Sequence, residues 1–335
     1  MHKTSIILCL YFCLKTIFLM GQQNPIRIEG FIQGTTYHIT YFDSKNRDFK
    51  PKIEQILKEF DNSVSTYKKN SIISKINANV ENVKIDHYFK TCFIKAKEVW
   101  KITDGAFDPT VYPLVNAWGF GPGKKMKLEQ RQIDSIIQFV DFNLIELKKN
   151  KVVKKDLRVA LDFNSFAQGY SVDIVSDFLN KKGIKSYLVE IGGEVYAKGK
   201  KPDGSFWSVG IEKPIDNKET SNALKAIVKL ENLAIATSGN YRKFFVENGV
   251  KYSHQIDPKT GYTSKNNLLS TSIITKYCMD ADALATGLLV MGIEKSIAFL
   301  ELHKEIQAFL IYSDEFGNFK IYETEGLKNI LTELE

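Results

Sequence analysis

The sequence is poor in cysteine, with four cysteines in 335 residues. Two of them, Cys9 and Cys13, lie in an apolar N-terminal stretch and have no convincing lipoprotein cleavage context. The other two, Cys92 and Cys278, are far apart and lack the close spacing of thiolate metal ligands. The cysteines therefore indicate neither a thiolate metal centre nor a lipid anchor, and a disulfide is permitted rather than indicated.

Several motifs of common enzyme classes are also absent. The chain has no HExxH segment of a zinc hydrolase and no GxSxG nucleophile elbow of a serine hydrolase. The stretch "GFGPGKK" at 119–125 lacks the spacing of a phosphate-binding loop, and Pro122 removes one backbone donor. No internal repeat or low-complexity segment stands out. These absences argue against zinc hydrolases, serine hydrolases and P-loop enzymes.

Only one long apolar run occurs, and it lies at the N-terminus. Lys3 precedes the run, Lys15 interrupts it, and Gly21 ends it before a polar segment. This pattern predicts a signal peptide over residues 1–21. The alternative is an uncleaved anchor, although Lys15 divides the run below the roughly 20 residues that a membrane span needs. We therefore expect an exported, periplasmic protein, with association with the inner membrane as the alternative.

The remaining residues, 22–335, are enough for a large core in a single domain, and two interlocked lobes are the alternative. The formal charge is +7, and it falls to +5 when Lys3 and Lys15 are removed. The remaining positive charge is scattered along the chain, and no base-stacking motif accompanies it. Nucleic acid is therefore not an expected partner.

Strands and helices are intermixed along the chain without a regular strand–helix–strand rhythm, which favours an α+β fold. Residues 26–42 alternate as strands do, and another strand is expected to end at Asp162. Further strands are expected around "FWSVGIEKP", "KAIVKL", "LAIATSG" and "STSIITK", with a final helix and hairpin closing the chain. The other expected helices are 50–61, 86–103, the helix that contains 279–292, and one from about Ala167 that ends at Gly183.

The stretch "MDADALATGLLVMG" at 279–292 predicts a buried helix, because it is apolar on nearly all sides. Asp282 and Thr286 are four residues apart and share one face of this helix. One interpretation makes Asp280 an N-cap and Asp282 a first-turn residue that complements the helix dipole. That interpretation does not explain the pairing with Thr286. A buried carboxylate needs a partner, and a cation such as Mg²⁺ is a reasonable one.

Three other segments combine polar side chains with glycine or proline. In "DGAFDPTV", 104–111, Asp108 precedes a proline and is expected to be extended, as in an ordinary Asp-Pro turn. In "LDFNSFAQGYSVD", 161–173, a loop enters a helix, which suits a phosphate or a hard cation. The alternative there is a plain connection in which Ser165 caps the helix. In "YSHQIDPKTG", 252–261, His254 is either catalytic or structural.

Eight segments, taken in order, resemble the ApbE family of FAD:protein FMN transferases. The resemblance runs from about residue 30 to 325, which is nearly the whole chain after the signal. Each segment is modest alone, but eight in the same order are specific. The segments are "GTTY" near 34–37, "STYKKNSIISKIN" at 65–77, "DGAFDPTVYPLVNAWGFG" at 104–121, "LDFNSFAQGYSVD" at 161–173, "IGGEVYAKG" at 191–199, "ATSGNYRKFF" at 236–245, "YSHQIDPKTG" at 252–261 and "DADALATGLLVMG" at 280–292.

The resemblance implies an α+β architecture of antiparallel sheets and packed helices, with FAD in a cleft between lobes. Members of the family bind FAD and Mg²⁺, cleave the FAD pyrophosphate and release AMP. They attach FMN through a phosphoester to a threonine or serine of a partner protein, in a Ser/Thr-Gly-Ala-Thr-like segment. The implied partner is an exported flavoprotein subunit of a membrane electron-transport complex of the Na⁺-translocating quinone reductase or Rnf type.

The resemblance also implies roles for individual residues. Asp282 and Thr286 are the implied side-chain ligands of Mg²⁺, and the backbone carbonyl of Ser165 is a third. His254 is the candidate base that deprotonates the incoming threonine. The implied contacts with the flavin and the nucleotide are Gln33, Tyr67, Ala106, Phe107, Asp108, Asp162, Gln168 and Ile256.

Two positions depart from the family pattern, because many members have lysine at the place of Gln168 and methionine at the place of Gln33. Loss of the lysine cation weakens attraction to phosphates, although glutamine can still donate a hydrogen bond. Two other functions stay open. One is an FAD pyrophosphatase, in which water replaces the threonine, and the other is a non-catalytic periplasmic flavin-binding protein.

Overall fold

The computed structural model describes residues 24–123, 125–214, 224–240, 244–247, 250–264 and 266–334. The predicted signal peptide, 1–21, lies outside the described residues. Within the described ranges, no helix combines the length and the hydropathy that crossing a membrane requires.

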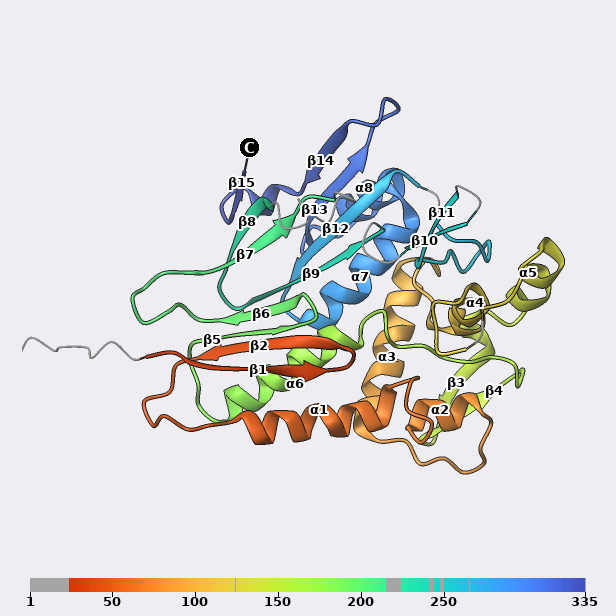
Figure 1. Ribbon diagram of the computed structural model, residues 1–335, viewed down its shortest axis with the longest axis horizontal. Helices are drawn as coiled ribbons and strands as arrows, with labels where there is room; N and C mark the ends of the chain where they lie inside the picture. Colours follow the sequence, from red (N-terminus) through yellow and green to blue (C-terminus); the bar gives the residue numbers. More distant parts are fainter. Residues whose placement is uncertain are drawn as a thin grey trace, which may run out of the picture.

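An eight-stranded antiparallel sheet forms the centre of the molecule (Figure 1). Its strand order, β1-β2-β5-β6-β9-β12-β13-β14, brings the N-terminal hairpin beside strands from the middle of the chain. This arrangement confirms the expected antiparallel α+β architecture. The strands are β1 (Ile26–Ile32), β2 (Thr35–Tyr41), β5 (Tyr187–Ile191), β6 (Glu194–Lys198), β9 (Leu233–Gly239), β12 (Leu268–Thr275), β13 (Gln307–Ser313) and β14 (Phe319–Glu323).

The two faces of this sheet are covered differently, because alternate residues of each strand point to opposite sides. Val195 and Ile235 pack with Trp207 beneath a second, three-stranded sheet. Ala236 and Ile273 belong instead to the larger core on the helical side. Three layers result, with helices on one face of the central sheet and the small sheet on the other. The small sheet has the order β15 (Leu331–Glu333), β8 (Leu224–Leu230), β7 (Trp207–Glu212).

Helices α6 and α7 pack directly on the central sheet and on each other, while α1 packs on α6 and on the β1–β2 hairpin, and α3 lies further out (Figure 1). The five helices expected from the sequence are present, the final one being α8, and Gly183, at φ +81°, follows the end of α6 as predicted. The helices are α1 (Lys50–Val64), α2 (Ile72–Asn77), α3 (His87–Ile102), α4 (Tyr112–Trp118), α5 (Gln130–Ile137), α6 (Ala167–Lys181), α7 (Cys278–Met291) and α8 (Ile293–Leu302).

Two short hairpins and three single-turn 3₁₀ helices complete the described part of the chain. The hairpin strands are β3 (Ile145–Lys148), β4 (Lys151–Lys154), β10 (Phe244–Glu247) and β11 (Val250–Ser253), and the 3₁₀ helices are η1 (Pro109–Val111), η2 (Phe142–Leu144) and η3 (Glu325–Leu327). Lys148 and Lys151 pair at the end of the β3–β4 hairpin, and residues 149 and 150 form the tight turn between the two strands. Lys149 and Asn150 both have positive φ there.

The prediction of a strand that ends at Asp162 is wrong. Residues 159–163 are buried but belong to no strand. The side-chain amide of Asn77 takes the place of a neighbouring strand, since it both donates to and accepts from the backbone of Leu161, at 2.8 Å each. The backbone N–H of Asp162 donates to the carbonyl of Pro109 at 2.8 Å. A buried backbone must be paired, and here loops and an amide pair it.

Candidate active site

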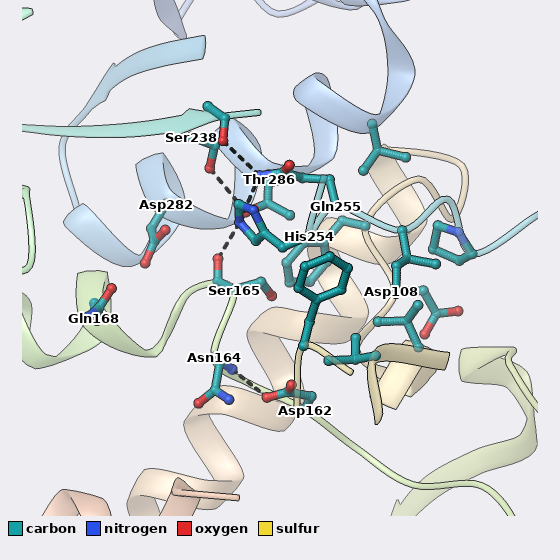
Figure 2. Close-up of a pocket in the computed structure, with 18 of the residues that line it drawn as sticks. Asp108, Asp162, Asn164, Ser165, Gln168, Ser238, His254, Gln255, Asp282 and Thr286 are labelled. Carbon is teal, nitrogen blue, oxygen red and sulfur yellow. Dashed lines mark hydrogen bonds between the residues drawn. The ribbon is translucent and has the colours of Figure 1, made fainter. Parts of the chain in front are cut away.

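A cavity of about 300 Å³ opens where helices α6 and α7, the end of β9 and the loops around residues 106–120 and 254–258 meet (Figure 2). Its wall mixes carboxylates and hydroxyls with aromatic and aliphatic side chains. Most of the residues singled out by the sequence line it. They are Tyr67, Ala106, Phe107, Asp108, Asp162, Ser165, Gln168, His254, Ile256, Asp282 and Thr286.

The three residues implied as cation ligands lie together on the cavity wall (Figure 2). The hydroxyl of Thr286 donates to the carbonyl of Ser165 at 3.2 Å and lies 3.3 Å from the hydroxyl of Ser238. Asp282, one turn earlier on α7, is buried and accepts a hydrogen bond from the backbone N–H of Gly169 at 2.9 Å. Helix α7 and the loop before α6 therefore bring a carboxylate, a hydroxyl and a carbonyl to the same cavity wall.

Burial raises the pKa of Asp282 to about 7. The hydrogen bond from Gly169 opposes this rise, and the carboxylate of Asp173 adds to it. A carboxyl group whose ionisation is this unfavourable gains most from a nearby positive charge. The electrostatics of α7 therefore favour a cation beside Asp282.

The available donors fit Mg²⁺. This ion prefers oxygen ligands and binds through one or two carboxylates while keeping several waters or phosphate oxygens. One carboxylate with a hydroxyl and a carbonyl is such a set. The described residues contain no cluster of three histidine, cysteine, aspartate or glutamate side chains that could hold a metal. The carboxylate, hydroxyl and carbonyl oxygens that are present suit a softer ion such as zinc, which favours histidine and cysteine, less well than they suit Mg²⁺.

His254 lies on the same cavity, next to the buried side chain of Gln255. The two side-chain Nε2 atoms are 2.9 Å apart, and the Gln255 amide also donates to the carbonyl of Gly239 at 3.1 Å. An amide turned the other way would place its oxygen against that carbonyl, so the nitrogen faces both groups. Nε2 of His254 then accepts and carries a lone pair.

Asp162 is held by the chain around it. Its carboxylate accepts from the backbone N–H of Asn164 at 2.9 Å, and burial raises its pKa to about 6. It lies on the cavity wall close to the loop that supplies Ser165 (Figure 2). A protonated Asp162 can donate a hydrogen bond, and an ionised one can only accept.

Asp108 has an extended backbone, as predicted, and its carboxylate is already bonded within the protein. One oxygen accepts from the backbone and hydroxyl of Thr110 at 2.8 and 2.6 Å, and the other accepts from the backbone of Phe142 at 3.1 Å. Burial nevertheless raises its pKa to about 6. The side chain therefore serves to fix the turn at η1, and the backbone carbonyl of Asp108 accepts from the backbone N–H of Val111 in the same turn.

The remaining candidates divide between the wall and the hairpin tip. Tyr67 is 64% exposed at the cavity edge, while Phe107 and Ile256 are buried in its wall. Gln33 is not among the lining residues. It lies at the β1–β2 turn with φ +54°, and its side chain exchanges hydrogen bonds with Ser171 on α6 at 2.7 and 3.1 Å.

Several wall residues were not singled out from the sequence. Thr237 and Ser238 lie in "ATSGNYRKFF" and Glu194 in "IGGEVYAKG", which were matched as segments but given no role. Glu194 is buried at the start of β6. A glutamate in an alternating strand resembles an ordinary solvent-facing residue, so only the three-dimensional packing shows that it faces the cavity.

The interpretation of Asp280 as an N-cap is wrong. The N-cap of α7 is Tyr277, and Asp280 is in the first turn, where it forms an ion pair with Lys95 of α3 at 2.8 Å. The cap comes from another helix, because the carboxylate of Asp173 on α6 accepts from the backbone N–H groups of Cys278 and Met279. Ser165 is not a cap either, since α6 begins after Phe166 without a side-chain cap.

Comparison with other proteins agrees with this picture. The sequence profile of the ApbE family matches residues 33–310. A Haemophilus influenzae protein named FAD:protein FMN transferase is 37% identical over 307 residues, which cover 88% of each chain. The flavin transferase ApbE from Vibrio cholerae has a similar structure, with a TM-score of 0.83 and 34% identity over 92% of this chain and 99% of that one. The apo form of Pseudomonas stutzeri flavinyl transferase ApbE gives a TM-score of 0.82 at 32% identity over 93% and 98%.

The fold, covered nearly end to end by these structures, is that of the flavin transferases. The chain belongs to the ApbE family.

Proposed function

We propose that the protein is a Mg²⁺-dependent FAD:protein FMN transferase. It attaches FMN through a phosphoester to a threonine or serine of an exported flavoprotein and releases AMP. The observation that carries the proposal is the joining of Ser165, Asp282 and Thr286 on a cavity that also contains His254. The name of the 37% identical relative supports the same activity.

The chain's own residues would hold Mg²⁺ through the Asp282 carboxylate, the Thr286 hydroxyl and the Ser165 carbonyl. Bound there, Mg²⁺ supplies a positive charge and a Lewis acid that withdraws electrons from the FAD pyrophosphate. The hydrogen bond from Gly169 keeps the Asp282 side chain in place. Holding the reacting groups in position is most of what phosphoryl transfer requires of a protein.

His254 is the proposed base. The threonine hydroxyl of the target attacks the FMN phosphorus, a new phosphorus–oxygen bond forms, and the bond to the bridging oxygen of AMP breaks. The hydroxyl proton goes to Nε2 of His254, the nitrogen that faces Gln255 and carries the lone pair. The Gln255 amide must turn aside for the incoming hydroxyl, while its bond to Gly239 gives it an alternative partner.

FAD is proposed to lie along the cavity wall with Tyr67 and Phe107 as aromatic surface for its rings. Gln168 would donate a hydrogen bond to a phosphate oxygen where other members have lysine. We also propose export through the signal at 1–21. The partner is a flavoprotein subunit of a membrane electron-transport complex of the Na⁺-translocating quinone reductase or Rnf type. The scattered surface charge gives no reason to expect nucleic acid.

The test is incubation of the mature protein with FAD, Mg²⁺ and an exported target domain that carries a Ser/Thr-Gly-Ala-Thr-like segment. We expect one FMN mass on the target threonine and one AMP released per transfer, as measured by intact mass and chromatography. AMP and free FMN without any modified target would establish a pyrophosphatase instead. FAD recovered unchanged after long incubation with Mg²⁺ and target would establish a flavin-binding protein. Either result would overturn the proposal.

A further inference from the structure

The junction of α6 and α7 joins the two parts of the proposed cation site, since Ser165 precedes α6 and Asp282 lies in α7. Three contacts hold this junction at its start. Asp173 of α6 accepts from the backbone N–H of Cys278 at 2.8 Å and from that of Met279 at 2.9 Å. Gly169 of α6 donates to Asp282 at 2.9 Å.

Asp173 supplies a cap that α7 lacks. The first N–H groups of a helix have no partner within the helix, and Tyr277, the N-cap residue, provides no side-chain bond. Both oxygens of Asp173 fill this need from a neighbouring helix. A carboxylate at this end also interacts favourably with the positive end of the helix dipole.

Because α6 and α7 approach closely at Gly169, the cap from Asp173 determines how the two helices are placed relative to each other. A Cβ at residue 169 would lie 2.5 Å from the carbonyl oxygen of Cys278 and 2.8 Å from the Cβ of Asp282. The helices therefore touch at their backbones, with no side chain between them to set the spacing. The carboxylate of Asp173, one turn after Gly169 on the same helix, is the side chain that ties the two backbones together.

We propose that Asp173 is a positioning residue of the cation site. It fixes the first turn of α7 against α6 and thereby sets the place of Asp282 relative to the Ser165 carbonyl. The inference rests on the proposed Mg²⁺ site. Without Asp173, the start of α7 loses two hydrogen bonds to α6, and the Asp282 carboxylate loses its fixed distance from the other oxygen donors.

The test measures cation binding without turnover. The full mature protein is titrated with Mn²⁺, with free Mn²⁺ followed by its electron paramagnetic resonance signal, and Mg²⁺ is then used as a competitor. In Asp173→Ala we expect the dissociation constant of both ions to rise about tenfold, as is usual when a residue that orients a metal ligand is removed. Asp173→Asn keeps one acceptor oxygen and is expected to bind with intermediate affinity. Asp177→Asn is the control, because Asp177 is exposed one turn further along α6.

Saturating Mg²⁺ should restore most of the kcat of Asp173→Ala while the Mg²⁺ concentration for half-maximal rate stays raised. If Asp173→Ala or Asp173→Asn is less stable but binds Mn²⁺ as the unmodified protein does, Asp173 is only a structural cap and the inference is wrong. If Asp173→Ala does not fold, the Mn²⁺ affinity of Asp173→Asn decides whether Asp173 positions the cation site. If the unmodified protein itself binds no Mn²⁺ or Mg²⁺, the proposed cation site fails, which is a distinguishable result.

Discussion

At the scale of single residues, the most informative contrast is between two aspartates two positions apart on α7. Asp282 is buried on the cavity and bonded to Gly169, whereas Asp280 pairs with Lys95 across to α3. The sequence separates them only by their helical phase relative to Thr286. The two aspartates have different surroundings in the structure, so a substitution of Asp280 serves as the control for the same substitution of Asp282.

Asp282→Asn is expected to lower Mg²⁺-dependent transfer by about 100-fold or more, because it removes the charged oxygen from the proposed cation site. Asp280→Asn should keep its rate within about twofold, since a partly exposed ion pair contributes little. Rates of FMN transfer at saturating FAD over a range of Mg²⁺ concentrations make the comparison. Equal loss in both variants, or full activity in Asp282→Asn, would contradict the ligand assignment.

At the scale of elements, the contact between α6 and α7 depends on the absence of a side chain at residue 169. Alanine in place of glycine favours a helix by about 1 kcal/mol. The new Cβ, however, would meet a backbone oxygen at 2.5 Å, which cannot move away as a flexible side chain can. The steric cost of overpacking, about 1–3 kcal/mol, therefore outweighs the helical gain.

Gly169→Ala is expected to lower the free energy of unfolding by about 1 kcal/mol and to weaken cation binding, because α7 must move away from α6. Asp177→Ala, at an exposed position of α6, should change stability by less than about 0.5 kcal/mol. Urea unfolding and Mn²⁺ titration measure the two effects. A more stable Gly169→Ala variant with unchanged binding would show that the helices are free to separate at this point.

The elements also show what sequence patterns can and cannot supply. Helix α7 was predictable because its residues are apolar all round, and buried helices have that composition. The prediction of a strand ending at Asp162 was wrong, because the backbone of Leu161 is paired by the side chain of Asn77 rather than by a neighbouring strand. Nothing local in the sequence distinguishes these two kinds of partner. The cap of α7 was missed for the same reason, since Asp173 is about a hundred positions away.

At the scale of the whole molecule, the layered α+β arrangement followed from the mixture of helices and alternating strands. Which strands are neighbours did not follow, because the order of the central sheet places β2 next to β5 and β9 between β6 and β12. Segments that match a family pattern supplied most of the predicted residues that line the cavity, Ser165 and Thr286 among them. Glu194 carries no such signal alone and becomes a site residue only when β6 takes its place in the sheet.

Buried carboxylates give the whole molecule a characteristic pH dependence. The pKa of Asp108 is raised to about 6 and that of Asp173 to about 7, chiefly by burial, from the ordinary value of 3.8. Between about pH 4 and these values, the folded state holds protons that the unfolded state has released. The free energy of unfolding contributed by these groups therefore falls as pH rises from 4 to 7.

Asp108→Asn should make the free energy of unfolding fall less steeply with rising pH, because asparagine does not titrate. For a shift of about two pKa units the effect is on the order of 3 kcal/mol between pH 4 and pH 7. Urea unfolding of both proteins at half-unit steps of pH, in EDTA, measures the difference in slope. Parallel curves for the two proteins would show that Asp108 has an ordinary pKa. If the free energy of unfolding fell more steeply with pH in Asp108→Asn, the pKa of Asp108 would be lowered rather than raised.

The separation in sequence of the oxygen ligands of the proposed cation site has a consequence for folding. Ser165 and Thr286 are 121 positions apart, and their meeting requires α6, α7 and the central sheet to be in place. An unfolded chain has no such site, and a partly folded one has only fragments of it. Under the proposed function, acquisition of the ion is therefore a late event that reports completed folding, and flavin transfer would begin only in molecules that have reached that state.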